Sequence, residues 1–297
     1  MASPVVRTGE FAFRPLRKPE EFRQAEELQR EALPGDAVPV VPAPLLRSLQ
    51  DIGGLVLGAF ADIHLAGITA SSIGWDGTTL YHHSHVTAVR PEYQSHRVGF
   101  RLKAFQRDEV LRLGLSEVRW GFDPLSRPSA SLAVRHLGAR PDAYLPNHFG
   151  RLSEEERPRD ESDLLHVRWS LGSAEVEQRL AGTLPGVEEL RERQRSSVAI
   201  LETELDDSGL RRPTAVSEPN GPLATVEVPF DLATVRDHEP AAVRRWRHAV
   251  RDAFRASFDL GYRVDDFAVV SLEHERRGFY LLRPAPPGAG PSPPAPG

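Results

Sequence analysis

Three strand-like runs separated by short turns constrain this chain more than any other feature. They are Gly54 to Phe60, Leu65 to Ile73 and Leu80 to Val89. Asp76-Gly77, before the third run, is typical of a tight hairpin turn. Consecutive strands joined by such turns pair antiparallel, so these runs predict a meander.

Helical patterns lie on both sides of the meander. Pro19 begins one helix, and Val98 to Leu113 predicts another that ends at Gly114. A strand, a helix and two more strands follow, up to Leu171. The predicted order is β-α-α-β-β-β-α-β-α-β-β. It favours an α/β fold with a mixed, mostly antiparallel sheet flanked by helices, over a core domain of residues 1–172.

The sequence changes character after Gly172. Residues 173–222 are predicted to be a partly helical segment and then, from Asp206 to Pro222, a linker rich in Pro, Gly, Ser and charge. A smaller α/β unit is predicted over 223–283, with a helix whose apolar stripe includes Trp246 and Phe254. The Pro- and Gly-rich tail, 284–297, is expected to be disordered.

Composition excludes several classes of function. The 297 residues carry a formal net charge of −5, which argues against nucleic acid or an anionic membrane as the main partner. The chain has no cysteine, which rules out disulfides, thiolate metal sites and cysteine nucleophiles, and we expect no metal. No apolar run suits a secretory signal or a membrane span, so a cytoplasmic protein is expected.

The segment from Val86 to Lys103 carries the candidate site. A strand ends at Arg90-Pro91, a tight loop follows, and a helix begins near Arg97. This arrangement directs free backbone N–H groups and the positive end of the helix dipole to one place, which suits a pyrophosphate. A plain strand-to-helix crossover explains the same residues, because the loop holds a single glycine, Gly99.

This segment resembles the strand-four-to-helix-three signature of the GNAT acyltransferase superfamily, Val-x-Pro-x-Tyr-(Arg or Gln)-Gly-x-Gly-x-Gly-x-x-Leu. Ser95 and Arg97 replace two of its glycines. The matching residues are Val89, Pro91, Tyr93, Gln94, Gly99 and Leu102.

Further strings resemble a narrower predicted acetyltransferase group related to amino acid N-succinyltransferases. Phe122-Asp-Pro-Leu125, Leu137-Gly-Ala139 and the heptapeptide from Tyr144 to Gly150 are similar to its FDPL, KLGA and YLPNYYG strings. The resemblance implies transfer of an acetyl or succinyl group from acetyl-CoA or succinyl-CoA to a small-molecule amine, with an amino acid as the suggested acceptor. A backbone N–H within Val86, Thr87 and Ala88 would meet the acyl carbonyl. The other cofactor-binding candidates are Gln94, Ser95, His96, Arg97, Val98, Gly99, Arg101 and Ser129.

Histidine suits a base that takes a proton from an ammonium near neutral pH. His83 and His85 lie two apart on a strand and therefore face the same side, with His82 opposite. They are candidate catalytic residues, or strand histidines that are either satisfied by their neighbours or at the surface. Asp123 is a third candidate, or a turn residue before Pro124.

The acceptor pocket and the general acid are less defined. Tyr144, Asn147, His148 and Phe149 are the substrate-binding candidates. Many family members place a tyrosine on the fourth helix where this chain has Val134, so no general acid is assigned.

Two classes of function stay open: an active acyl-CoA-dependent N-acyltransferase, and a degenerate relative that acts as an acyl-CoA-binding or assembly module. The histidines, Gly99 and the FDPL string favour the enzyme. The departures at Ser95, Arg97, Pro128 and Val134 favour the binding module. A homodimer is expected only because symmetric pairs are common among oligomers.

Overall fold

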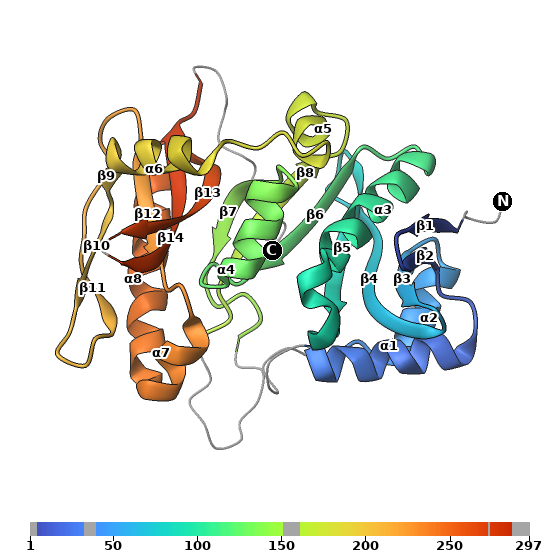
Figure 1. Ribbon diagram of the computed structural model, residues 1–297. Coiled ribbons are helices and arrows are strands. Elements are labelled where there is room, and N and C mark those ends of the chain that lie inside the picture. Colours follow the sequence, from blue (N-terminus) through green and yellow to red (C-terminus); the bar gives the residue numbers. More distant parts are fainter. Residues whose placement is uncertain (1–4, 33–39, 151–160, 273, 287–297) are drawn as a thin grey trace. The chain divides into compact units, whose positions relative to one another are not determined.

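The computed structural model describes residues 5–32, 40–150, 161–272 and 274–286. They belong to two compact units, Met1–Trp120 with Ser170–Ser173, and Gly121–Trp169 with Ala174–Gly297 (Figure 1). The division falls within a strand, whereas the sequence predicts a first domain of 1–172. That domain boundary stays a prediction.

The first unit is built on a mostly antiparallel sheet with strand order β1-β2-β3-β4-β5-β6. Neighbours pair antiparallel from β1 to β5, and β6 joins β5 in parallel. The expected mixed sheet flanked by helices is therefore confirmed. The strands are β1 (Val6–Thr8), β2 (Phe11–Pro15), β3 (Leu55–Ala61), β4 (His64–Trp75), β5 (Leu80–Val89) and β6 (Glu117–Phe122), the last reaching into the second unit. The helices are α1 (Pro19–Ala32), α2 (Ala43–Asp51) and α3 (Val98–Arg112), with a short 3-10 helix η2 (Pro91–His96) before α3.

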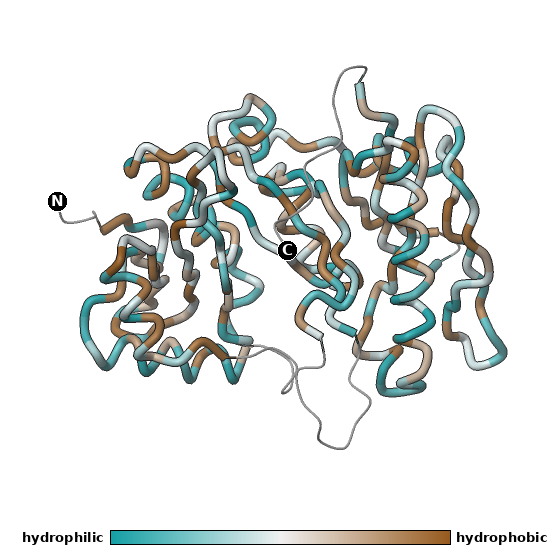
Figure 2. The backbone as a smooth tube through the Cα atoms, turned by 180° about the vertical axis from the view of Figure 1, so that it is seen from behind, coloured by the Kyte–Doolittle hydropathy of each residue, from teal (hydrophilic) through white to brown (hydrophobic). Residues whose placement is uncertain are grey.

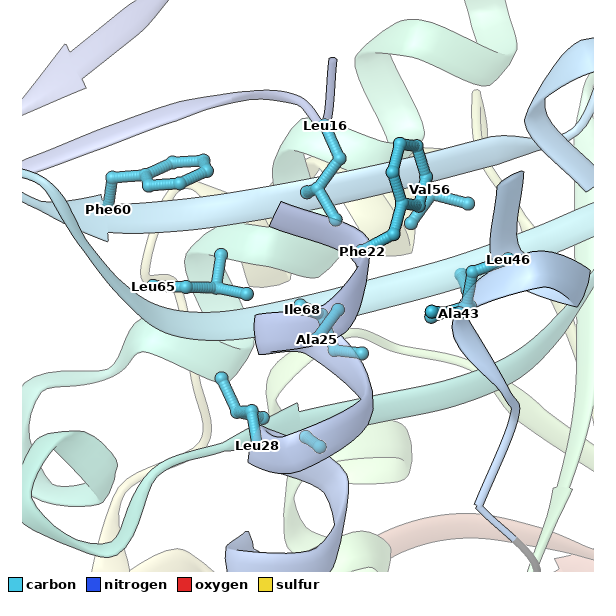
Figure 3. Packing of buried hydrophobic residues seen from close by; sticks show 12 residues of the cluster. Leu16, Phe22, Ala25, Leu28, Ala43, Leu46, Val56, Phe60, Leu65 and Ile68 are labelled. Atoms are coloured by element: carbon cyan, nitrogen blue, oxygen red, sulfur yellow. The ribbon is translucent and has the colours of Figure 1, made fainter. Parts of the chain in front are cut away.

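Helices α1 and α2 cover one face of this sheet. Figure 3 shows Phe22 and Ala25 of α1 and Leu46 of α2 directed at side chains of β3 and β4. Phe22 is 2% exposed and Leu46 is fully buried. Burying a side chain of this size stabilises the fold by about 1.5–3 kcal/mol. The apolar stripes of the two helices thus hold them to the sheet.

Helix α3 packs on the opposite face through Val98, Leu102 and Phe105. Its close approach depends on Gly67 of β4. A Cβ there would lie 3.0 Å from Leu102 Cδ1 and 3.1 Å from the Ala88 carbonyl oxygen, tighter than ordinary contact. A residue without a side chain lets the helix lie this close to the sheet.

The second unit contains three sets of strands. β7 (Arg140–Leu145) pairs antiparallel with β8 (Leu164–Ser170), and β10 (Leu201–Leu205) forms a hairpin with β11 (Arg211–Val216). A four-stranded sheet has the order β13-β14-β12-β9. Its strands are β9 (Val198–Ala199), β12 (Ala224–Val228), β13 (Tyr262–Leu272) and β14 (Glu275–Pro284). The helices are α4 (Arg127–Ala130), continued by a π-helix η3 (Ser131–His136), then α5 (Ala174–Leu180), α6 (Val187–Arg195), α7 (Leu232–His238) and α8 (Pro240–Asp259).

Helix α8 buries the stripe that its sequence predicts. Hydrophobic and hydrophilic residues alternate around its turns (Figure 2), and Trp246 and Phe254 are almost fully buried. Phe254 packs edge-on against Tyr280 of β14, with ring centroids 5.0 Å apart. On the other face of the four-stranded sheet, Leu190 of α6 packs against Ala268 and Phe279. This small sheet is therefore covered by a helix on each face.

The linker predicted from Asp206 to Pro222 is wrong for the part that forms β11. Asp206 Oδ1 accepts hydrogen bonds from the amides of Ser208 and Leu210, and Gly209 has a φ of 78°, so these residues form a tight turn. The turn returns the chain beside β10. Polar, half-exposed strands resemble loops in composition, so the pattern alone concealed this hairpin. The expected disordered tail lies outside the described residues from 287 onward.

Candidate functional site

Strand β5 has one edge that is only partly paired. It pairs with β4 along its whole length, but with β6 only at His82 and His83, opposite Val118 and Arg119. From Ser84 onward, that edge has no strand partner among the described residues. Unpaired backbone N–H and C=O groups point outward from such an edge. An extended ligand can bind to them in the way that an added strand would.

A β-bulge lies where this open edge begins. Val86 pairs with Ala70 and Ser84 pairs with Ser71, so His85 is an additional residue without a partner on β4. Bulges bend a strand and redirect its side chains. Here the bulge lies two residues beyond His83, the last residue of β5 that pairs with β6.

His83 and His85 lie on the same side of the sheet, as their spacing predicts. Their ring centroids are 5.0 Å apart, and His85 Nε2 lies 2.7 Å from Ser72 Oγ. Desolvation lowers the pKa of His85, although its side chain is exposed at the surface. A neutral imidazole can accept a proton near physiological pH, which a general base requires.

His82 faces the other side, also as predicted. It is fully buried, and its Nδ1 lies 3.0 Å from Ser71 Oγ. Burial lowers the pKa of His82 to about 4, because the imidazolium loses its hydration there. His82 is therefore a neutral core residue.

The junction between β5 and α3 is a short 3-10 helix followed by one left-handed residue. Arg97 has a φ of 57° and a ψ of 24°, and no side chain caps the start of α3. Glycine adopts this conformation at the lowest cost. The Arg97 guanidinium is exposed and lies 4.5 Å from the ring centroid of Phe100. The first amides of α3 and one cation therefore adjoin the end of the open edge.

The other cofactor-binding candidates occupy different environments. Gln94 Nε2 donates to the Val89 carbonyl oxygen at 3.1 Å, and Thr87 Oγ1 lies 2.9 Å from Thr69 Oγ1. Ser95 and His96 are exposed, Gly99, Arg101 and Val86 are half-buried, and Val98 and Ala88 lie in the core. Ser129 belongs to the second unit, where its hydroxyl accepts a hydrogen bond from the helix-capping Ser126.

The strained backbone at Arg97 leads to a stability prediction. A β-branched side chain fits poorly at positive φ, so Arg97→Val should lower the free energy of unfolding by about 1–2 kcal/mol relative to Arg97→Gly. Urea denaturation followed by circular dichroism measures the difference. Equal stability of the two variants would show that Arg97 is not held in the left-handed region.

Asp123 is occupied by structural contacts. Its two carboxylate oxygens each lie 2.9 Å from a guanidinium nitrogen of Arg247 on α8. Oδ1 also accepts from the Leu125 amide at 2.9 Å, as in a turn closed by an Asp side chain. These contacts favour the interpretation of Asp123 as a turn residue.

Tyr144 lies inside the second unit. Its hydroxyl donates to Asp163 Oδ2 at 2.7 Å, and its ring stacks on Phe254. Burial and the neighbouring carboxylate raise the pKa of Tyr144, so its hydroxyl stays protonated. Tyr144 also lines an open cavity of about 530 Å³, together with Arg255 and Tyr262.

The remaining substrate candidates lie on an exposed loop held by Asp163 and Ser162. The Asn147 amide donates to Asp163 Oδ1 at 2.9 Å, and the Phe149 amide donates to Ser162 Oγ at 2.8 Å. His148 is exposed, and Phe149 is 58% exposed. Tyr144 is therefore buried whereas these three residues are exposed, although Tyr144 and Asn147 both contact Asp163. A role for any of the four in binding stays a prediction.

Sequence reasoning missed a buried amine on α3. Lys103 is 2% exposed and contacts Ser84 of β5. One signal was available, because Lys18 and Lys103 are the chain's two lysines in a sequence that otherwise uses arginine. Val134, which the sequence comparison placed at a possible acid position, is 1% exposed within the π-helix, and its side chain offers no acid.

No family model matches the chain, and no curated protein matches its sequence. Solved structures similar to it include the ribosomal-protein-S18-alanine N-acetyltransferase of Escherichia coli, with 15% identity and a TM-score of 0.45. The ribosomal-protein-S5-alanine acetyltransferase of Vibrio fischeri has 12% identity and a TM-score of 0.47. An aminoglycoside 6′-N-acetyltransferase complexed with coenzyme A has 15% identity and a TM-score of 0.40.

The three similarities cover 55%, 58% and 54% of this chain and 96%, 98% and 96% of the respective structures. None of the helices in the described residues combines the length and the apolar character needed to cross a bilayer.

Proposed function

We propose that this protein is an acyl-CoA-dependent N-acyltransferase. The observation that carries the proposal is the open edge of β5, which leads directly to the uncapped start of α3 within one compact unit. The extended thiol-bearing arm of an acyl-CoA could lie along the open edge of β5, and its pyrophosphate could bind at the start of α3. The resemblance of the same residues to the GNAT signature supports an acyl-CoA as the ligand.

The reaction needs two contributions from the protein. A backbone N–H of the open edge, within Val86 to Ala88, would polarise the thioester carbonyl. The amine attacks the carbonyl carbon directly, the C–S bond breaks, and the coenzyme leaves as a thiolate. His85, with His83 beside it, would take a proton from the acceptor ammonium before the attack, because only the neutral amine has a free lone pair. The proton that the nitrogen loses after the attack would go to the departing thiolate. A thiolate is a good leaving group, so this route needs no dedicated acid at Val134.

The donor and the acceptor are narrower proposals. Several short sequence strings of this chain resemble those of an acetyltransferase group related to amino acid N-succinyltransferases. This resemblance supports acetyl-CoA or succinyl-CoA as the donor and an amino acid as the acceptor. Tyr144, Asn147, His148 and Phe149 lie within one of these strings and are the residues we would vary first to change the acceptor. A screen of free amino acids with both donors, following release of the coenzyme thiol, tests this choice.

Isothermal titration with acetyl-CoA, succinyl-CoA and free coenzyme A tests the binding site. We expect saturable binding that Arg97→Glu weakens about tenfold or more, because the charge reversal faces the phosphates at the helix start. Arg23→Glu, on the exposed surface of α1, is the matched control and should bind like the wild type. No binding of any of the three at millimolar concentration would overturn the proposal.

A binding module without catalysis is the second candidate. It is favoured by the arginine in a glycine position and by the buried Val134 where relatives carry tyrosine. Saturable acyl-CoA binding without thiol release in the amine screen would support this alternative.

A further inference from the structure

Lys103 lies at the point where β5 and β6 separate. The last pair between these strands is His83 with Arg119, so Ser84 and Trp120 are the next residues on each strand. Lys103 Nζ donates to Ser84 Oγ at 3.1 Å and lies 4.1 Å from the centroid of the Trp120 ring. The amine therefore contacts both strands where their pairing ends.

A second buried polar group holds the amine in place. Lys103 Nζ donates to Gln106 Oε1 at 2.7 Å, and Gln106 is fully buried one turn further along α3. Gln106 Nε2 also lies 3.5 Å from Ser84 Oγ. Ser84 is itself the residue that precedes the bulge at His85. Lys103 thus contacts Ser84, the residue at which the open edge of β5 begins.

The choice of lysine at this position is informative. Burying a cation costs more than burying an apolar side chain of similar size, so stability alone does not favour it. Arginine, which the chain uses almost everywhere else, stays charged at every accessible pH, whereas a lysine amine can lose its proton. Burial lowers the pKa of Lys103 to about 7, so both forms are populated near neutrality.

Several titratable and polar groups lie on the elements around Lys103. On β5, His82 is two residues before Ser84 and on the same side of the strand, and its pKa of about 4 leaves it neutral. On α3 the buried acid is Glu109, which is paired with Arg112. β4 presents the hydroxyls of Thr69 and Ser71 on this face, and β6 presents the indole of Trp120. Ionisation of Lys103 therefore changes the charge at this position near neutral pH.

We propose that Lys103 is a positioning residue, which acts through Ser84 on the bulge and open edge of β5, and that its protonation is coupled to acyl-CoA binding. This inference rests on the function proposed above. The ammonium form can donate to Ser84 and Gln106 while its charge faces the Trp120 ring, and an anionic ligand favours a nearby cation. The protonated form should therefore bind acyl-CoA more tightly.

The two-lysine composition allows a direct test. Protein labelled with ¹³C at the lysine ε-carbon should give two side-chain NMR signals, and Lys18→Met, an exposed site on the surface, identifies the signal of Lys103. In the free protein this signal should titrate near pH 7. Saturating acetyl-CoA should raise the titration midpoint by about one pH unit, which corresponds to about tenfold tighter binding by the protonated form.

Binding measurements across pH provide the second readout. For the wild type, affinity should fall about tenfold from pH 6 to pH 9 relative to Lys103→Met, whose residual pH dependence reports only the ligand phosphates. Lys103→Arg, which cannot lose its proton, should follow the Lys103→Met profile. Ser84→Ala should weaken the coupling and leave Lys103 titrating, because the part of the coupling that acts through that hydroxyl is lost and only the direct attraction between the ammonium and the anionic ligand remains.

The outcomes separate the two proposals. If acetyl-CoA binds but the Lys103 midpoint does not move, or the wild type and Lys103→Met have the same pH profile, the role of Lys103 is refuted and the acyl-CoA site stands. If the wild type binds no acyl-CoA at any pH, both proposals fail together.

Discussion

Replacing His85 with alanine is expected to lower kcat by about a hundredfold or more, whereas the dissociation constant of acyl-CoA stays within about twofold. The imidazole lies beside His83 and Ser72 at the start of the open edge, where an attacking amine would lose its proton. Desolvation lowers the pKa of His85, so the base is neutral over a wider pH range than an ordinary histidine. In the wild type at saturating acyl-CoA, kcat should fall as pH drops below this lowered value.

The measurement is a steady-state assay of thiol release with an amine acceptor found in the amino acid screen, repeated from pH 5 to pH 9. His64→Ala is the matched control, because His64 is an exposed histidine at the start of β4 and should leave turnover unchanged. His83→Ala tests whether the neighbouring ring supports His85 or replaces it. Full activity of the His83→Ala/His85→Ala double variant would exclude these histidines as the base.

Replacing Asp163 with asparagine is expected to destabilise the second unit by about 3 kcal/mol, since it leaves Arg251 without its buried partner. Asp163 is 1% exposed, and its carboxylate accepts from Arg251 Nε at 2.9 Å, from Tyr144 and from the Asn147 amide. Burial alone would raise the pKa of Asp163, but the hydrogen bonds from Arg251, Asn147 and Tyr144 outweigh it and lower the pKa.

The sign of the pH dependence follows from that lowered pKa. The carboxylate contributes stability above the pKa of the unfolded chain, about 3.9, and this contribution is lost as pH falls through the lower folded value. Urea denaturation should therefore show the full gap between wild type and Asp163→Asn at pH 7, and a narrower gap below pH 4. The exposed Asp207→Asn is the control. A gap that does not change with pH would mean that Asp163 is not ionised in the folded protein.

Local sequence patterns alone were sufficient to predict several elements of both units. The turn between β4 and β5 was recognisable because Asp76 Oδ1 accepts from the amides of Thr78 and Thr79 and because Gly77 has a φ of 95°. Both effects act within four residues and do not depend on the rest of the fold. The same holds for the stripe of α8, whose spacing directs Trp246 and Phe254 to one side. The hairpin of β10 and β11 was not predicted, because half-exposed polar strands have the composition of loops.

The sequence by itself determined that β5 runs into α3 and that His83 and His85 share a side of the sheet, because chain connectivity and the two-residue repeat of a strand require it. Only the tertiary structure decided where β5 parts from β6, which residue forms the bulge, and that Lys103 is buried between the two strands. It also decided that Asp123 meets Arg247 on α8 rather than standing free. Such contacts join residues far apart in the chain, and they follow from how sheets and helices pack, which no local pattern encodes.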